Sequence, residues 1–142
     1  MKATVAWKGE DQGMALEATA DSGHTVTMDV SPEAGGQNQG LRPMEMVLLG
    51  MGGCTSFDVI SILKKGREDV TDCVAEMDAA RADEIPKVFT EIHIHFVVTG
   101  RGLNPAKVER AIQLSAEKYC SASIMIGKTA RITHDFEIRE AG

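Results

Sequence analysis

Two of the three cysteines, Cys54 and Cys120, have neighbours that suit redox chemistry. Cys54 follows Gly52 and Gly53, and the missing side chains leave space for a small molecule to approach its sulfur. Cys120 precedes Ser121-Ala122-Ser123, a segment small enough for a second thiol to come close. An oxidised cysteine beside an accessible thiol closes readily to a disulfide. The two cysteines are therefore candidate working thiols, but the pattern alone does not bring them together in space.

A buried structural thiol is the alternative for Cys54, because free cysteine is among the most buried residue types. Cys73 alternates with Ala75 and Met77 on the apolar face of a predicted strand, which indicates a core thiol, and we assign it no role. An odd number of cysteines without a signal-peptide pattern is a poor match to a disulfide framework. We therefore expect reduced thiols in a cytoplasmic protein.

Three histidines raise the hypothesis of a metal site. His93 and His95 alternate with Ile94 and Phe96, so the two histidines point to the polar side of their strand. His134 lies on the apolar face of the last predicted strand, where a hydrogen-bonded core histidine is the ordinary case. A site with all three imidazoles would need both faces of the sheet at once. We predict no metal and no cofactor.

The N-terminal part is predicted to be an antiparallel meander followed by a loop. Alternating apolar and polar residues separated by glycine-containing turns indicate such strands. The three runs are residues 3–8, 14–19 and 25–30. Residues 31–42 contain three glycines and show no periodicity, so we expect a long loop there.

A long helix is predicted to carry Cys54. Pro43 begins it, in a position where the missing N–H of proline does no harm, and the pattern continues to about residue 67. No charged residue occurs from Met46 to Phe57, so we expect protein to cover this stretch on nearly all sides. A membrane span is the alternative, because the apolar stretch approaches the ~18 residues at which spanning is considered. Asp58 and its polar neighbours argue for a central helix wrapped by sheets.

The C-terminal half is predicted to contain three more strands and a second helix. The strands are residues 70–79, 88–98 and 130–139. Asn104 and Pro105 supply a cap and a first-turn proline for the helix, which continues to about residue 119. Cys120 then lies at or just beyond the helix end. With 142 residues, of which 43% are hydrophobic, the chain suits a single α+β domain covering residues 1–142.

Charge argues against nucleic acid as a partner. The 15 basic and 21 acidic residues give a net charge of −6, and there is no long run of Lys or Arg.

The order of these features resembles that of the OsmC/Ohr family over essentially the whole chain. The specific features are Arg42-Pro43-Met44-Glu45-Met46 at the start of a helix, Cys54 eleven residues after the proline, and Cys120 after a second helix. The segment from Gly50 to Val59 is most similar to the YhfA-like branch of that family.

The resemblance implies an intertwined homodimer in which antiparallel sheets wrap around two central helices, with each active site at the subunit boundary. It also implies a thiol-dependent peroxidase. Cys54 would attack an organic hydroperoxide to give an alcohol and a sulfenic acid, and Cys120 would condense with that acid to a disulfide. An external dithiol would then reduce the disulfide.

The supporting residues depart from the family pattern. The family glutamate directly follows the proline, whereas Met44 stands there and Glu45 comes one residue later. Residues 1–41 contain no arginine, so Arg42 is the candidate for the cation beside the thiolate, and Asp58 shares a helix face with Cys54. A thiol in an apolar helix without a cation should have a raised pKa. The alternative function is a small-molecule-binding or stress-related protein of this fold without efficient peroxidase activity.

Overall fold

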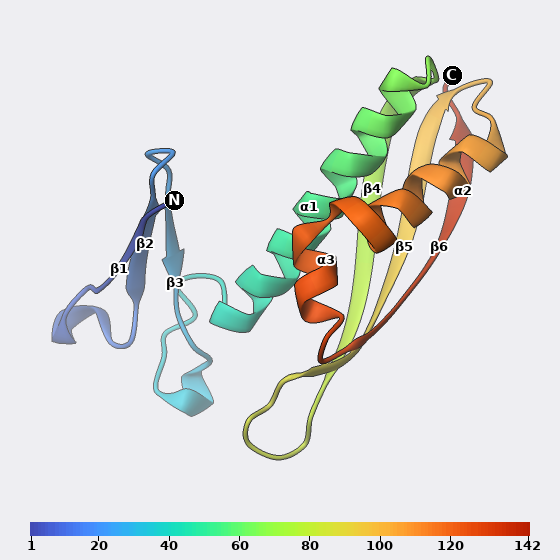
Figure 1. The fold of residues 1–142 in the computed structure, drawn as a ribbon. Helices are drawn as coiled ribbons and strands as arrows, with labels where there is room; N and C mark the ends of the chain where they lie inside the picture. The colour runs from blue at the N-terminus through green and yellow to red at the C-terminus, as the bar shows by residue number, and fades with distance from the viewer. The chain divides into compact units, whose positions relative to one another are not determined.

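The computed structural model describes residues 1–142 as two compact units, Met1–Leu49 and Gly50–Gly142 (Figure 1). The chain is a mixed α+β structure with two three-stranded sheets, one in each unit. The long helix α1 (Pro43–Lys65) begins in the first unit and continues in the second. The predicted fold class is therefore confirmed, and the helix ends within two residues of its predicted end.

The first unit contains the predicted antiparallel meander. Strands β1 (Ala3–Trp7), β2 (Leu16–Ala20) and β3 (Thr25–Met28) pair in sequence order. β2 begins two residues later than predicted, because the short helix η1 (Glu10–Gln12) and the turn after it occupy the preceding residues.

Asp29 organises the loop that follows the meander. Its buried carboxylate accepts hydrogen bonds from the backbone N–H groups of Val30, Gln37 and Gln39. The bond from Gln39 is the main reason that the pKa of Asp29 lies below its usual value. A side chain at Gly36 would collide with the Val30 carbonyl oxygen, so the close return of the chain requires glycine there. The loop includes the short helix η2 (Pro32–Ala34).

The second unit contains a sheet in the order β4-β5-β6. β4 (Asp69–Arg81) and β5 (Phe89–Arg101) are antiparallel, whereas β6 (Arg131–Glu140) runs parallel to β5, so the expectation of antiparallel sheets is wrong for this pair. A parallel pair needs a crossover connection. Here the connection consists of α2 (Pro105–Leu114), one π-helical turn η3 (Ser115–Tyr119) and the short helix α3 (Ser121–Ile126). These helices and α1 lie on one side of the sheet (Figure 1).

The core of the second unit lies between its helices and the central strand β5. Alternate residues of β5 face the helices and are buried, as the alternation in the sequence predicted. Buried core side chains come from α1 (Met51, Val59 and Leu63), β5 (Ile92, Ile94, Phe96 and Val98) and α2 (Val108, Ala111 and Ile112). The packing fixes α1 and the crossover helices over the same sheet face.

Phe96→Ala is expected to destabilise this core strongly. Phe96 is the largest fully buried side chain, and removing a buried phenylalanine costs about 3–5 kcal/mol through lost transfer energy and a residual cavity. Urea unfolding followed by circular dichroism measures the change. Val74→Ala is the control, because Val74 is 42% exposed and a surface truncation should change the free energy of unfolding by less than about 0.5 kcal/mol. Equal effects of the two variants would contradict the assigned core.

The prediction that protein covers the uncharged part of α1 on nearly all sides holds only on one side of the helix. Met51, Gly52, Thr55, Val59 and Leu63 are buried, but Phe57 is 71% exposed. By length and composition α1 could cross a membrane, with a mean hydropathy of 1.7 and 28% of that segment buried; core helices of soluble proteins pass the same test. One chain therefore leaves part of the apolar helix uncovered, which is typical of a surface that contacts a partner.

Candidate functional site

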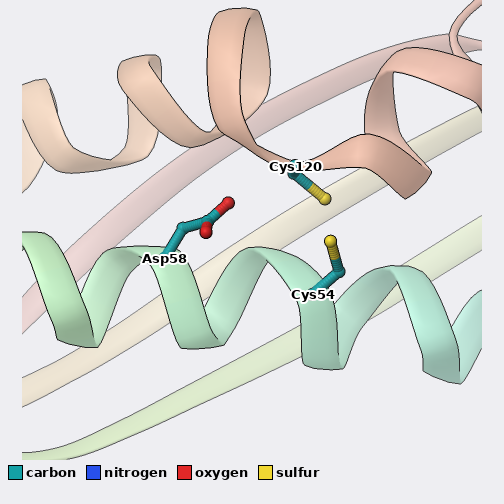
Figure 2. Close-up of side chains that lie close together, drawn as sticks. All are labelled: Cys54, Asp58 and Cys120. Carbon is teal, nitrogen blue, oxygen red and sulfur yellow. The ribbon is translucent and has the colours of Figure 1, made fainter.

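Cys54, Asp58 and Cys120 lie together in the second unit. Cys54 and Asp58 are one helical turn apart on α1, and Cys120 approaches them from the junction before α3 (Figure 2). The two sulfurs and one carboxylate oxygen all lie within 4.8 Å of one another. The structure thus brings together the two cysteines that the sequence analysis selected, although they are 66 positions apart in the chain (120 minus 54).

A π-helical turn places Cys120 opposite α1. After α2 the helix widens at η3, where the N–H of Cys120 donates to the carbonyl of Ser115, five residues earlier, at 2.8 Å. Cys120 itself has an extended backbone and separates η3 from α3. Single π-helical turns occur frequently at functional sites. The expectation that Cys120 follows the end of the second helical segment is confirmed.

Cys120 is fully buried, and its sulfur has polar neighbours. Its Sγ accepts hydrogen bonds from the N–H of Ser123 at 3.3 Å and from the hydroxyl of the same residue at 3.0 Å. Burial and the neighbouring Cys54 thiol raise the pKa of Cys120, and the two bonds from Ser123 oppose that rise. Burial is the largest of these effects. Cys120 is therefore a protonated thiol at neutral pH, held in one position.

Asp58 is oriented by a chain of hydroxyl groups. Its Oδ2 accepts a hydrogen bond from Ser115 at 2.9 Å, and the Ser115 oxygen lies 2.8 Å from the hydroxyl of Thr55. The single hydroxyl proton of Ser115 is used toward Asp58, so Thr55 must donate to Ser115. Both hydroxyl residues are buried. The role of Ser115 could not be predicted from the sequence, because no local pattern pairs residues 60 positions apart.

Cys54 and Cys120 differ in solvent exposure, so they are suited to different roles. Cys54 is partly exposed, whereas Cys120 is completely buried. An external oxidant therefore meets Cys54 first. All three cysteines are free in the structure. The arrangement can pass from a Cys54 sulfenic acid to a disulfide with Cys120, and the cluster of two thiols and a carboxylate could also hold a metal ion.

Arg42 and Glu45 belong to the first unit, where both have hydrogen-bonding partners. The Glu45 carboxylate accepts from the N–H of Arg42 at 2.7 Å, which satisfies a free donor at the start of α1. The Arg42 guanidinium donates to the Asn38 side chain at 2.9 Å and to the Gly40 carbonyl at 3.1 Å. Their supporting roles toward Cys54 stay predictions.

Cys73 lies on the helix-facing side of β4, as predicted. It pairs with Val98 of β5, and burial, followed by the charge of Asp72, raises the pKa of the Cys73 thiol to about 11. A thiol with this pKa is almost entirely protonated at neutral pH and is a poor nucleophile. Cys73 is the natural control for experiments on the other two cysteines.

The histidines lie on opposite faces of the sheet, as the alternation predicted. His93 and His95 both approach Oδ1 of Asp135, with Nε2 of His93 at 3.0 Å and Nδ1 of His95 at 2.7 Å. His134 pairs with the buried Ile94 and therefore faces the helices. The three imidazoles do not form one site.

Asp135→Asn should destabilise the protein in a pH-dependent way. The hydrogen bond to Asp135 raises the pKa of His95 above its ordinary 6.5, so this stabilisation is complete below 6.5 and is lost as the pH rises through the raised pKa. The bond from His95 lowers the pKa of Asp135 below its ordinary 3.8, so the stabilisation is also lost as the pH falls through that lowered value.

Urea unfolding at two pH values measures this effect. The loss of unfolding free energy in Asp135→Asn should be larger at about pH 5.5 than at about pH 9, since a larger fraction of His95 is charged at the lower value. Asp83→Asn, in the exposed turn between β4 and β5, is the matched control. An equal loss at both pH values would show that the His95–Asp135 ion pair does not contribute.

Comparison with known proteins gives matches over nearly the whole chain. The family described as OsmC-like protein matches residues 36–135, which include Cys54, Asp58 and Cys120. Protein YhfA of Escherichia coli K12 is 45% identical over 138 residues, covering 97% of this chain and 98% of that protein.

Solved structures share the fold. A hypothetical protein from Aquifex aeolicus VF5 is 28% identical, with a TM-score of 0.84 and coverage of 99% of this chain and 97% of that one. The organic hydroperoxide resistance protein OhrB of Bacillus subtilis is 20% identical, with a TM-score of 0.63 and coverage of 96% and 98%. At the latter identity the likeness concerns the fold alone.

Proposed function

The chain belongs to the OsmC-like protein family, and on that premise we propose that it is a thiol-dependent peroxidase that reduces organic hydroperoxides through Cys54 and Cys120. The observation that carries the proposal is the meeting of a partly exposed thiol and a buried one in a single cluster (Figure 2). Hydroperoxide resistance is the named role of some proteins that share the fold, which supports the same chemistry here.

The proposed cycle begins with Cys54. Its thiolate attacks the terminal oxygen of the hydroperoxide, the O–O bond breaks, and the alkoxide leaves as an alcohol after taking up a proton. Cys54 is then a sulfenic acid. Cys120 attacks that sulfur, a disulfide forms, and the sulfenic oxygen leaves as water. An external dithiol restores both thiols by exchange and becomes a disulfide itself.

The buried position of Cys120 suits the second step of this cycle. Its pKa is raised chiefly by burial, so it does not compete with Cys54 for the peroxide. The two hydrogen bonds from Ser123 hold its sulfur in place and stabilise the thiolate that must form during attack. Arg42, Glu45 and Asp58 have supporting roles in the proposal.

Consumption of cumene hydroperoxide by the purified, reduced protein tests the proposal. A dithiol should sustain many turnovers. The remaining hydroperoxide is measured directly, and its loss in samples without protein is subtracted. If the protein bound an apolar small molecule but did not consume peroxide, the alternative of a binding protein without efficient peroxidase activity would replace the proposal.

We also propose that the protein is a cytoplasmic homodimer in which a second copy covers the exposed side of α1. Phe57 is 71% exposed in a single chain and lies on the helix that carries Cys54. A large aromatic side chain of this kind contributes strongly to an interface when a partner buries it.

Phe57→Glu should therefore shift the protein from dimer to monomer. A charge on the covered side of α1 would have to lose its water in the dimer, which costs several kcal/mol when the charge is unpaired, or about a hundredfold or more in dissociation constant. Sedimentation velocity over a range of protein concentrations measures the shift. Phe57→Leu is the control and should remain dimeric. A dimer of unchanged stability in Phe57→Glu would contradict this interface.

A further inference from the structure

The cluster at the thiol site has the composition of a site for a soft metal ion. Two sulfurs and a carboxylate oxygen, all within 4.8 Å of one another, come from Cys54, Cys120 and Asp58. Figure 2 shows the three side chains directed toward a common space between α1 and the crossover helices. Thiolate ligands select ions such as Zn²⁺ over Mg²⁺ and Ca²⁺, which prefer oxygen.

We propose that the reduced form of this protein binds one Zn²⁺-class ion per chain through Cys54, Cys120 and Asp58. Zinc lies about 2.3 Å from thiolate sulfur and about 2.0–2.2 Å from carboxylate oxygen. Tetrahedral bonds of these lengths place the ligand atoms about 3.5–3.8 Å apart. The three ligand atoms already lie within 4.8 Å of one another, so each pair needs to close by at most about 1 Å. Water completes the tetrahedron from the partly exposed side at Cys54.

The surrounding hydrogen bonds already orient two of the three ligands. The Oδ2 atom of Asp58 is held by Ser115, which leaves the other carboxylate oxygen for the ion. Ser123 donates two hydrogen bonds to the Cys120 sulfur, as partners of a thiolate ligand do. Such outer contacts fix the direction of a ligand and are worth about 10–100-fold in metal affinity.

The charge balance also favours a divalent cation. Binding converts two thiols to thiolates and releases two protons, so the ion, two thiolates and Asp58 carry a net charge of −1. Apparent affinity should therefore rise with pH, because the ion competes with protons for the two sulfurs.

Metal binding and oxidation exclude each other at this site, because a disulfide has no thiolate to offer. The zinc dithiolate reacts with one hydroperoxide and two protons to give the disulfide, an alcohol, water and the free ion. The ion would thus protect the thiols from slow oxidation and leave when peroxide arrives. This release rests on the proposed peroxidase function, whereas the binding itself does not.

Competition between the protein and a chromophoric zinc chelator tests the binding. The experiment uses Zn²⁺ alone, the full-length protein and a phosphine reductant. Unlike a dithiol, the phosphine does not compete with the protein for Zn²⁺. We expect one ion per chain. Cys54→Ser and Cys120→Ser should each weaken binding by more than about 100-fold, and Asp58→Asn by about 10–100-fold. Cys73→Ser should bind like the unmodified protein, and Mg²⁺ should not compete.

Two measurements on the unmodified protein keep the proposal testable if a variant misfolds. Co²⁺ in place of Zn²⁺ should produce thiolate-to-metal charge-transfer absorption, and Zn²⁺ should slow alkylation of Cys54 by iodoacetamide. Absence of stoichiometric binding, or equal affinity in folded Cys54→Ser, would overturn the site. The zinc measurements contain no peroxide and therefore do not depend on peroxidase activity. A protein that binds zinc but does not reduce hydroperoxides would refute only the proposed function.

Discussion

Cys54→Ser is expected to abolish the reduction of organic hydroperoxides. Removing the nucleophile of a covalent mechanism typically costs several orders of magnitude, so the turnover rate should fall by more than about 1,000-fold. The serine hydroxyl is similar in size but cannot be oxidised to a stable equivalent of sulfenic acid. The change is measured as consumption of cumene hydroperoxide in the presence of a dithiol.

Cys73→Ser is the matched control for this experiment. Cys73 is a free thiol of the same unit, but its pKa is raised to about 11 by burial, so it should not take part. Its replacement should leave the rate within about twofold, since a residue outside the reacting atoms does not change the barrier. Retention of the full rate in Cys54→Ser, with circular dichroism unchanged, would refute the proposed function.

The elements of this fold could be predicted because each has a clear local signal. Pro43 and Asn104 mark the starts of α1 and α2, and the alternation around Ile94 separates the two faces of β5. The ends of β4 and β5 were placed up to three residues short, because both strands continue beyond their apolar alternation through backbone pairing. The backbone hydrogen bonds between two strands cannot be recognised from the sequence of one strand.

The site was predictable in its residues but not in its geometry. Cys54 and Cys120 could be selected from their neighbours, yet their approach depends on the π-helical turn at Ser115–Tyr119, where one extra residue per turn leaves no mark in the apolar pattern. The bond from Ser115 to Asp58 likewise depends on how α2 and η3 pack on α1. Long-range packing decides both, so they became visible only in the structure.

For the exposed side of α1, the sequence indicates more burial than a single chain provides. An uncharged stretch from Met46 to Phe57 indicates complete cover, but one chain buries only part of it. A second copy of the chain would supply the cover that the uncharged stretch leads one to expect and that a single chain does not provide. The difference is the physical basis for the proposed second copy.

Cys120→Ser should separate the first chemical step from the cycle. Cys54 is unchanged in this variant, so one equivalent of hydroperoxide per chain should still be consumed at a rate within about tenfold of the original, since the attacking thiol is retained. Continued turnover should fall by at least about 100-fold. A neighbouring thiol acts at an effective concentration far above that of millimolar external thiols.

The state of Cys54 after this single turnover is the decisive observation. In Cys120→Ser the sulfenic acid has no neighbouring thiol to attack it, so a dimedone adduct should form at Cys54 and be found by mass spectrometry. The unmodified protein should give little adduct and instead lose two hydrogens as the Cys54–Cys120 disulfide forms. Undiminished steady turnover in Cys120→Ser would mean that the external thiol reduces Cys54 directly. The buried thiol would then serve to hold the site together, and its position beside Cys54 would need the metal-binding role rather than the peroxidase cycle to explain it.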